Sequence, residues 1–363
     1  MTADDKTRQY DLVDCHTHIM DKHDAEAGDR LLALAGKGGI GAVNVLALGE
    51  LTWGEGNAPG LVAKARHPQE IYLFAGLDYS ILAGEAGPSH LLPFFEQVAR
   101  LRAMGCDGLK MINGKPDFRR NAGLALDSPL YDKCFRQLAS LGLPLLWHVN
   151  DPEEFWDPQL APEWAKAPGW LYDERHPSKE SIHAETERML ARHPEVKVIF
   201  AHFYFLSADL PRAARLLERF PNVHLDLAPG IEMFHNFSAN LAAARDFFLR
   251  FQDRILFGSD LVEGSPLSRV EVVRRCLETD DVFHVPTDES LFWPDHRTIL
   301  RGLKLPPSVL AKVYAGNFRR LAGDRPRPLD LAAVRAELAR LSAIAEQLGK
   351  SPNLAQQALA ALG

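Results

Sequence analysis

The stretch YDLVDCHTHI, residues 10–19, reads as a β-strand that carries two histidines. Side chains point alternately to the two faces of a strand, so Asp14, His16 and His18 share one face. Two imidazoles on one face can bind the same metal ion, but the pair alone could equally be two buried structural histidines. The later strands favour metal binding, because four of them also end in a candidate ligand.

The bulk composition is that of a globular protein with room for a large core. Of the 363 residues, 46% are hydrophobic and 25% charged, which fits one large α/β barrel or two medium domains. The net charge of −7 disfavours a nucleic-acid partner. The sequence shows no apolar run of membrane-spanning length, no hydrophobic signal core at the N-terminus and no close cysteine pairing, so we expect a cytoplasmic protein with no membrane partner.

Short apolar runs alternate with helix-like segments along most of the chain. The predicted strands are residues 10–19, 42–48, 71–77, 107–112, 143–149, 196–202, 222–227 and 255–260. Each is followed by a helical pattern, and most are nearly continuous in hydrophobicity, as parallel strands covered on both faces should be. The sequence therefore predicts a closed (β/α)8 barrel.

Beyond the eighth unit the pattern changes. Residues 295–303 and 308–320 look helical, and a Pro-rich break at 325–328 precedes two Ala- and Leu-rich helices. We divide the chain into a barrel, residues 1–325, and a helical extension, residues 326–363. The extension could mediate a homodimer, but packing on the outside of the barrel is the interpretation we favour. The long segment 150–177, with its several tryptophans, is expected to form an ordered lid.

The active site of such a barrel lies where its strands end. The strand ends carry His16, His18, Lys110, His148, His202 and Asp260. Each has a simple structural alternative, such as a helix cap, a hydrogen-bonded histidine or a lysine that reaches solvent. Together they would supply only nitrogen and oxygen donors, which suit Zn²⁺ and also Mn²⁺ or Fe²⁺.

A metal in this site would lower the pKa of a bound water and generate a nucleophile at neutral pH. Asp260 could contact the metal and accept the proton of that water. His202 could polarise the carbonyl under attack or protonate the leaving group.

With these residues the chain resembles the amidohydrolase superfamily of metal-dependent (β/α)8-barrel enzymes. The stretches VIFAH (198–202), ILFGSD (255–260) and VYAGNF (313–318) resemble the branch that contains aminocarboxymuconate semialdehyde and resorcylate decarboxylases and, as further relatives, lactone hydrolases. The resemblance implies one metal, held by His16, His18, His148 and Asp260, with His202 catalytic.

Lys110 allows a second arrangement. In binuclear members of the superfamily a carboxylated lysine at the end of strand four bridges two metals, and His148 and His202 would then hold the second ion. The alternative is a Lys110 that binds a substrate carboxylate or makes an ion pair. We expect this alternative, and therefore a single metal ion.

Other polar and aromatic groups lie close to the predicted strand ends. The candidates for substrate binding are Asn150, Asp151, Trp156, Glu232 and His235, together with Lys110. The function that we expect is hydrolysis of an amide, ester or lactone of a small molecule. Non-oxidative decarboxylation or hydration of a small carboxylate on the same metal is the first alternative, and a catalytically silent barrel that binds a small molecule is the second.

Overall fold

The computed structural model describes residues 10–49, 55–83, 92–166, 168–289, 291–292, 299–347, 349 and 353–363. Its central feature is a parallel sheet of eight strands that follow one another in chain order. The strands are β1 (Val13–Thr17), β2 (Ala42–Leu46), β3 (Ile71–Gly76), β4 (Gly108–Gly114), β5 (Leu145–Val149), β6 (Val198–Phe200), β7 (Val223–Asp226) and β8 (Ile255–Leu256).

The first and last strands close the sheet into a barrel. The backbone N–H of Cys15 donates to the carbonyl of Phe257 at 3.0 Å, and that of His18 donates to Leu261 at 2.8 Å. Thr17 and Leu261 also form a parallel bridge. The predicted (β/α)8 fold is confirmed, and the carboxyl ends of all eight strands meet at one end of the barrel.

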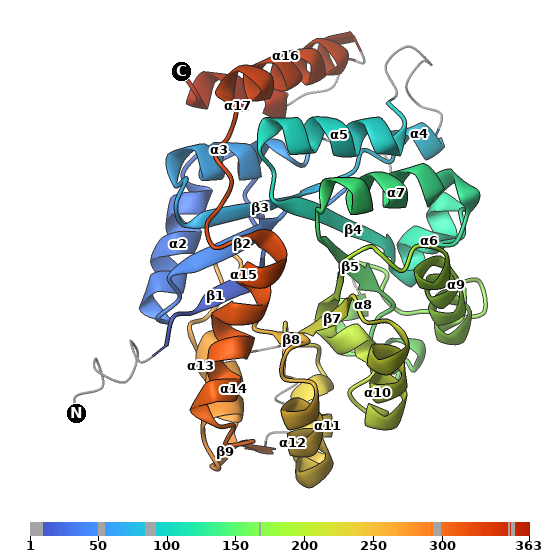
Figure 1. Cartoon of the computed structure of the whole chain (residues 1–363), viewed down its shortest axis with the longest axis vertical. Coiled ribbons are helices and arrows are strands. Elements are labelled where there is room, and N and C mark those ends of the chain that lie inside the picture. The colour runs from blue at the N-terminus through green and yellow to red at the C-terminus, as the bar shows by residue number, and fades with distance from the viewer. Residues whose placement is uncertain are drawn as a thin grey trace.

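Helices surround the sheet (Figure 1). They are α2 (Ala27–Lys37), α3 (Ala58–Arg66), α4 (Ser80–Ala83), α5 (Phe94–Met104), α6 (Pro116–Ala122), α7 (Asp132–Leu141), α9 (Lys179–Arg192), α10 (Leu210–Arg219), α11 (Met233–Ala239), α12 (Leu241–Arg250) and α13 (Ser268–Glu278). Helix α7 shows why they form: Cys134, Phe135 and Leu138 lie buried on one face, and the helix ends at Gly142 with a φ of +63°. Such left-handed termination favours glycine.

The predicted helix at residues 295–303 is wrong for its last part. Residues 299–301 form strand β10 (Ile299–Arg301), which pairs antiparallel with β9 (Val282–His284), while residues 295–298 lie outside the described part. Leu300 is buried between exposed Ile299 and Arg301, and this alternation is the period of a strand. The predicted helix at 308–320 corresponds to three consecutive helical segments, α14 (Pro307–Ala311), η4 (Lys312–Gly316) and α15 (Asn317–Ala322).

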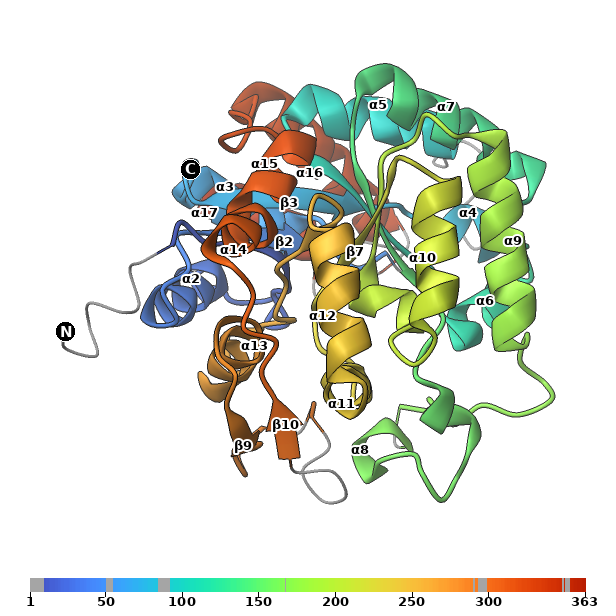
Figure 2. The same ribbon diagram turned by 60° about the horizontal axis from the view of Figure 1, so that its bottom comes forward.

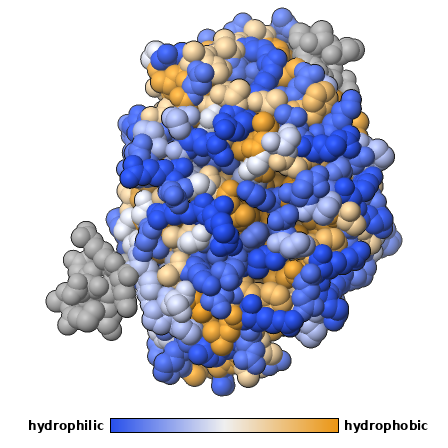
Figure 3. Space-filling view, in the orientation of Figure 1, coloured by the Kyte–Doolittle hydropathy of each residue, from blue (hydrophilic) through white to orange (hydrophobic). Residues whose placement is uncertain are grey.

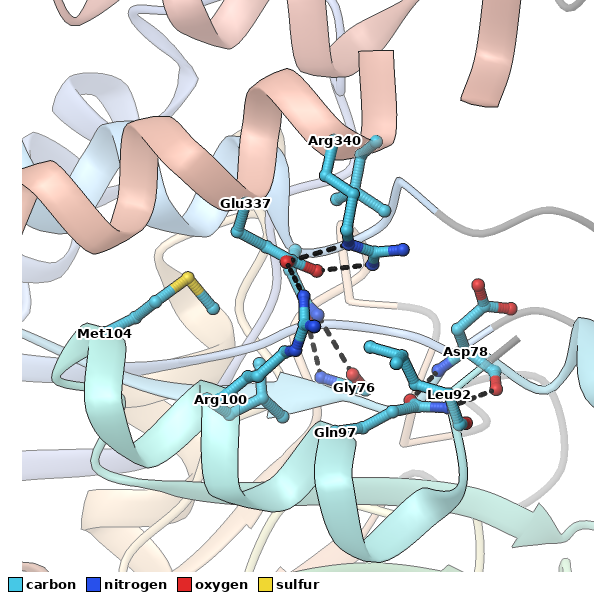
Figure 4. A pocket seen from close by; sticks show the side chains of 11 residues that line it. Gly76, Asp78, Leu92, Gln97, Arg100, Met104, Glu337 and Arg340 are labelled. Atoms are coloured by element: carbon cyan, nitrogen blue, oxygen red, sulfur yellow. Dashed lines mark hydrogen bonds and ion pairs between the residues drawn. The ribbon is translucent and has the colours of Figure 1, made fainter. Parts of the chain in front are cut away.

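The C-terminal helices α16 (Leu331–Gln347) and α17 (Leu354–Ala361) contact α3 and α5 on the outside of the barrel, at the top of Figure 1. Glu337 on α16 pairs with Arg100 of α5 at 3.0 Å and with Arg340, as Figure 4 shows. The cavity at this contact measures about 40 Å³, which admits water but no substrate. A role of these helices in a dimer stays a prediction.

The segment after β5 folds over the carboxyl end of the barrel. It contains η2 (Glu153–Trp156) and α8 (Glu163–Lys166), and Figure 2 shows α8 at the same end of the molecule as β9 and β10. Phe155, Ala165 and Tyr172 of this segment form a small buried cluster together with Ile231. The segment therefore has an apolar core of its own, as an ordered lid requires.

The outer surface carries many polar side chains. On the face seen in Figure 3, hydrophilic residues predominate and apolar residues appear between them in patches. In the described part of the chain, no helix combines the length and the apolar character that crossing a membrane would demand.

Candidate metal centre and substrate cavity

His16, His18 and Asp260 meet at the carboxyl end of the barrel. The Nε2 atoms of His16 and His18 lie 3.5 and 3.4 Å from Oδ1 of Asp260, and the three ligand atoms all lie within 4.8 Å of one another. Metal–ligand bonds of 2.0–2.2 Å at tetrahedral angles separate two ligand atoms by about 3.4 Å. The spacing of this triplet therefore suits a divalent metal ion.

The second nitrogen of each imidazole fixes the form of the ring. Nδ1 of His16 lies 2.7 Å from Oδ2 of Asp226, and Nδ1 of His18 lies 2.9 Å from the carbonyl oxygen of Leu46. Both partners are acceptors, so each Nδ1 carries the hydrogen and each Nε2 keeps its lone pair for the metal. Burial, with a contribution from the charge of Lys110, lowers the pKa of His16 well below its ordinary value. The residues present thus fit a divalent metal ion, which their donor atoms imply.

The side chain of Asp260 is an ionised carboxylate, and its backbone has an unusual conformation. Burial acts to raise the pKa of Asp260, but its close contacts with the imidazoles of His18, His16 and His202 outweigh burial and hold the pKa well below its usual range. Its φ of +57° is in the left-handed region, which costs a non-glycine residue about 1–2 kcal/mol. Nη1 of Arg269 donates to the carbonyl oxygen of Asp260 at 2.8 Å and stabilises this conformation.

Asp226, the last residue of β7, is a residue of the site that the sequence analysis missed, and Lys115, which lines the cavity, is another. One carboxylate oxygen binds His16, and the other accepts the backbone N–H of His202 at 2.8 Å and of Ala228 at 3.1 Å. Burial raises the pKa of Asp226 to about 6. Its position at a strand end, like that of the predicted ligands, was the available signal.

His202 enters the site from a left-handed turn. The φ angles of His202, Phe203, Tyr204 and Phe205 are +53°, +57°, +58° and +51°. The ring of His202 lies 5.0 Å from that of His16 and 4.8 Å from that of His148, centroid to centroid. Its Nδ1 is 3.1 Å from the carbonyl of Ala228, and burial lowers its pKa to about 4. The ring is therefore neutral, with an unprotonated Nε2.

His148 lies near the triplet but has another partner. Its Nε2 is 3.1 Å from Oδ1 of Asp151. The other carboxylate oxygen of Asp151, Oδ2, accepts from Nζ of Lys115 at 2.8 Å and from the hydroxyl of Tyr172. Metal binding through Nε2 of His148 would require its contact with Asp151 to be given up. Its role as a ligand stays a prediction.

Lys110 lies in the wall of the same cavity and is only 1% exposed. Burial lowers the pKa of Lys110 to about 8, against the opposing effect of the carboxylates of Asp226 and Asp260. At neutral pH it is a buried cation beside the triplet, where it could meet an anionic group.

The site cavity has a volume of about 480 Å³. Its walls include the six predicted strand-end residues, which are His16, His18, Lys110, His148, His202 and Asp260. A second compartment of about 220 Å³ adjoins it, and Lys115, His148, Trp170, His202, Asp260 and Leu291 line both. The structure thus brings the predicted chemistry into one space large enough for a small molecule.

Of the five other residues predicted to bind substrate, Asp151 lines the second compartment. Asn150 is buried and donates to the carbonyl of Lys179, while Trp156 packs on Tyr172 beside a separate groove. Glu232 is buried, and Nε2 of His235 is 2.7 Å from the carbonyl of Phe292. These four do not line the two compartments described above.

Comparison with known proteins links this geometry to a family. The family model described as an amidohydrolase matches residues 13–323. No curated protein matches the sequence.

Several solved structures share the fold. A dihydroxybenzoic acid decarboxylase from Polaromonas sp. JS666, with bound manganese and the inhibitor 2-nitroresorcinol, is similar at a TM-score of 0.54 and 14% identity, over 86% of this chain and 97% of the other. An amidohydrolase from Burkholderia multivorans with bound zinc has a TM-score of 0.51 and 16% identity, over 86% and 99%. The 5-carboxyvanillate decarboxylase from Sphingomonas paucimobilis has a TM-score of 0.51 and 13% identity, over 86% and 99%.

Proposed function

Because the chain belongs to the amidohydrolase family of metal-dependent enzymes, we propose that it hydrolyses an amide, ester or lactone bond of a small molecule. The observation that carries the proposal is the triplet of His16, His18 and Asp260, whose ligand atoms have the spacing of a divalent metal site at the floor of the cavity. A binding protein without catalysis would have no need for this donor set.

The proposed ion is zinc, because two imidazole nitrogens and a carboxylate oxygen suit it, although manganese or iron would also fit. When bound, such an ion lowers the pKa of a coordinated water and polarises a carbonyl group. His16, His18 and Asp260 would hold it, with His148 as the further ligand that the resemblance implies. Zinc and manganese occur in two of the similar structures.

The side chains of this site divide the remaining work. The carboxylate of Asp260 would accept the proton of the attacking water and return it to the leaving group. His202, with Nε2 unprotonated, would accept a hydrogen bond from the substrate or move a proton within the site. The lid would limit the access of bulk water.

Lys110 supports one alternative on the same site. A buried ammonium beside the triplet would hold a substrate carboxylate, as non-oxidative decarboxylation requires. Two of the similar structures are decarboxylases of aromatic acids. Decarboxylation is therefore the second candidate function.

A product analysis separates the two candidates. Zinc-loaded protein is incubated in ¹⁸O-water with a panel of lactones, esters, amides and aromatic carboxylic acids. Hydrolysis incorporates ¹⁸O into the carboxyl product, and this incorporation should be lost in Asp260→Asn. Release of CO₂ with no ¹⁸O in the organic product would refute hydrolysis and establish the alternative.

A further inference from the structure

The second compartment of the cavity has an aromatic wall built by the lid. Phe155, Trp164 and Trp170 all line it, and we call these three residues the aromatic cage. The rest of the apolar lining comes from Pro152, Phe205, Pro229, Ile231 and Leu291. The three residues of the cage belong to the segment after β5, whereas the metal triplet lies at the ends of the barrel strands.

The three rings pack against one another and together form one wall of the compartment. The rings of Phe155 and Trp170 are nearly parallel, with an interplanar angle of 15° and centroids 6.5 Å apart. The ring of Trp164 is perpendicular to both, at 81° and 88°, with centroid distances of 6.0 and 6.3 Å. A flat apolar group would meet ring faces and ring edges here, which are the contacts that aromatic pairs prefer.

The charges around the cage select the kind of occupant. Nζ of Lys115 lies 4.2 Å from the ring centroid of Trp170 and 2.8 Å from a carboxylate oxygen of Asp151. The protein therefore already places its own cation on Trp170, which leaves a cationic ligand less to gain from that ring. The pairing of Lys115 with Asp151 also leaves little net charge to attract an anion. An uncharged group suits the compartment best.

The cage is continuous with the metal centre. His148, His202 and Asp260 line both compartments, so one molecule can extend from the triplet to the cage. We propose that the aromatic cage binds an uncharged ring of the substrate, aromatic or alicyclic, that is separate from the group that reacts at the metal. The link between ring and reacting group rests on the proposed function, whereas binding of a ring by the cage does not.

Trp164 is the residue that distinguishes ligand binding from lid folding. Phe155 is buried and packs with Tyr172 and Ile231, so it also holds the lid together. Trp164 is 37% exposed and its ring contacts are with Phe155 and Trp170 alone among the described aromatic pairs. Leu160, on the same segment and 43% exposed, does not line the compartment and provides a matched control.

Binding of matched probes tests the proposal. Affinities of zinc-loaded protein are measured by calorimetry for butanoate, 4-phenylbutanoate and 4-cyclohexylbutanoate, which share a carboxylate and differ in the terminal ring. We expect the ring to tighten binding at least about tenfold. Trp164→Ala should remove most of this gain and leave butanoate binding unchanged. Trp164→Phe should keep most of the gain, and Leu160→Ala should keep all of it.

Two further probes make every outcome decisive. Benzyl alcohol, which has no carboxylate, tests the cage without the metal, and 4-(trimethylammonio)butanoate tests a cationic occupant. Binding of benzyl alcohol that depends on Trp164, with no binding of the acids, would support the cage and contradict the proposed metal chemistry. Equal affinity for butanoate and both ring-bearing acids, a gain that survives Trp164→Ala in folded protein, or a preference for the ammonium probe would overturn the inference.

Discussion

Replacing Asp226 with asparagine should weaken metal binding although Asp226 is not among the proposed ligands. In the native site its two oxygens accept three hydrogens, from Nδ1 of His16 and from the backbone of His202 and Ala228. An asparagine of the same shape has one acceptor oxygen and one NH₂ group. Whichever way the amide is turned, a donor faces a donor on one side.

The less costly orientation keeps the oxygen on the two backbone N–H groups. The NH₂ group then points at Nδ1 of His16, which can accept it only if the ring moves its hydrogen to Nε2. That nitrogen lies 3.5 Å from Asp260 and is the proposed ligand atom, so its lone pair would be lost to the metal. Loss of such an outer partner costs about 10- to 100-fold in metal affinity, or about 1.4–2.7 kcal/mol.

Zinc affinity of the Asp226→Asn protein is measured by competition with a chromophoric chelator, and the His16 tautomer by ¹⁵N NMR of the imidazole rings. Asp132→Asn is the matched control, because Asp132 pairs with Nε2 of His193 at 2.9 Å on the helices outside the site. It should leave zinc affinity unchanged. A folded Asp226→Asn protein with native zinc affinity and the native His16 tautomer would refute the reasoning.

Further expectations follow from the same geometry. Asp260→Asn should lower kcat by about 10²–10⁴ while most of the metal remains, and near-native turnover in the metallated variant would eliminate Asp260 as the base. His16→Ala combined with His18→Ala should remove the metal from a folded barrel, as elemental analysis and circular dichroism would show. Because burial lowers the pKa of Lys110 to about 8, its positive charge is present below that pH and lost above it. Butanoate affinity should therefore fall as the pH rises through about 8, whereas the Lys110→Met protein should bind butanoate weakly at every pH. We also expect one metal ion per chain, and a measured stoichiometry of two would contradict this expectation.

The fold was predictable because parallel strands that are covered on both faces appear in the sequence as short, nearly continuous apolar runs. Continuous apolar runs such as residues 71–75 alternate with helices, and the His16 and His18 pair marks the strand that faces the proposed metal site. The convergence of these histidines with Asp260 followed from topology alone, since the strands of a parallel barrel end at the same rim. The proposed roles of these residues await the experiments above.

Other features depend on contacts that a sequence does not record. Asp226 acts on His16 through a hydrogen bond between strands that are 210 positions apart. Strand β10 was predicted as part of a helix because a three-residue strand is too short to show a clear period. The lid was predicted as an ordered segment, but the perpendicular arrangement of Trp164 and Trp170 arises only when it folds over the barrel.

The strained backbone of this protein is concentrated at the proposed site. Among the described non-glycine residues, positive φ angles occur at Asn150, at residues 202–205, at Asp260 and at Lys304. All except Lys304 lie just beyond β5, β6 or β8, at the carboxyl end of the barrel. Each costs about 1–2 kcal/mol relative to ordinary backbone, so folding alone would not favour them. The compensating contacts are specific: Asp226 holds the backbone N–H of His202, and Arg269 holds the carbonyl of Asp260. Backbone strain therefore lowers the folding stability at the positions that direct His202 and Asp260 into one cavity. Strain of this kind is typical of active sites.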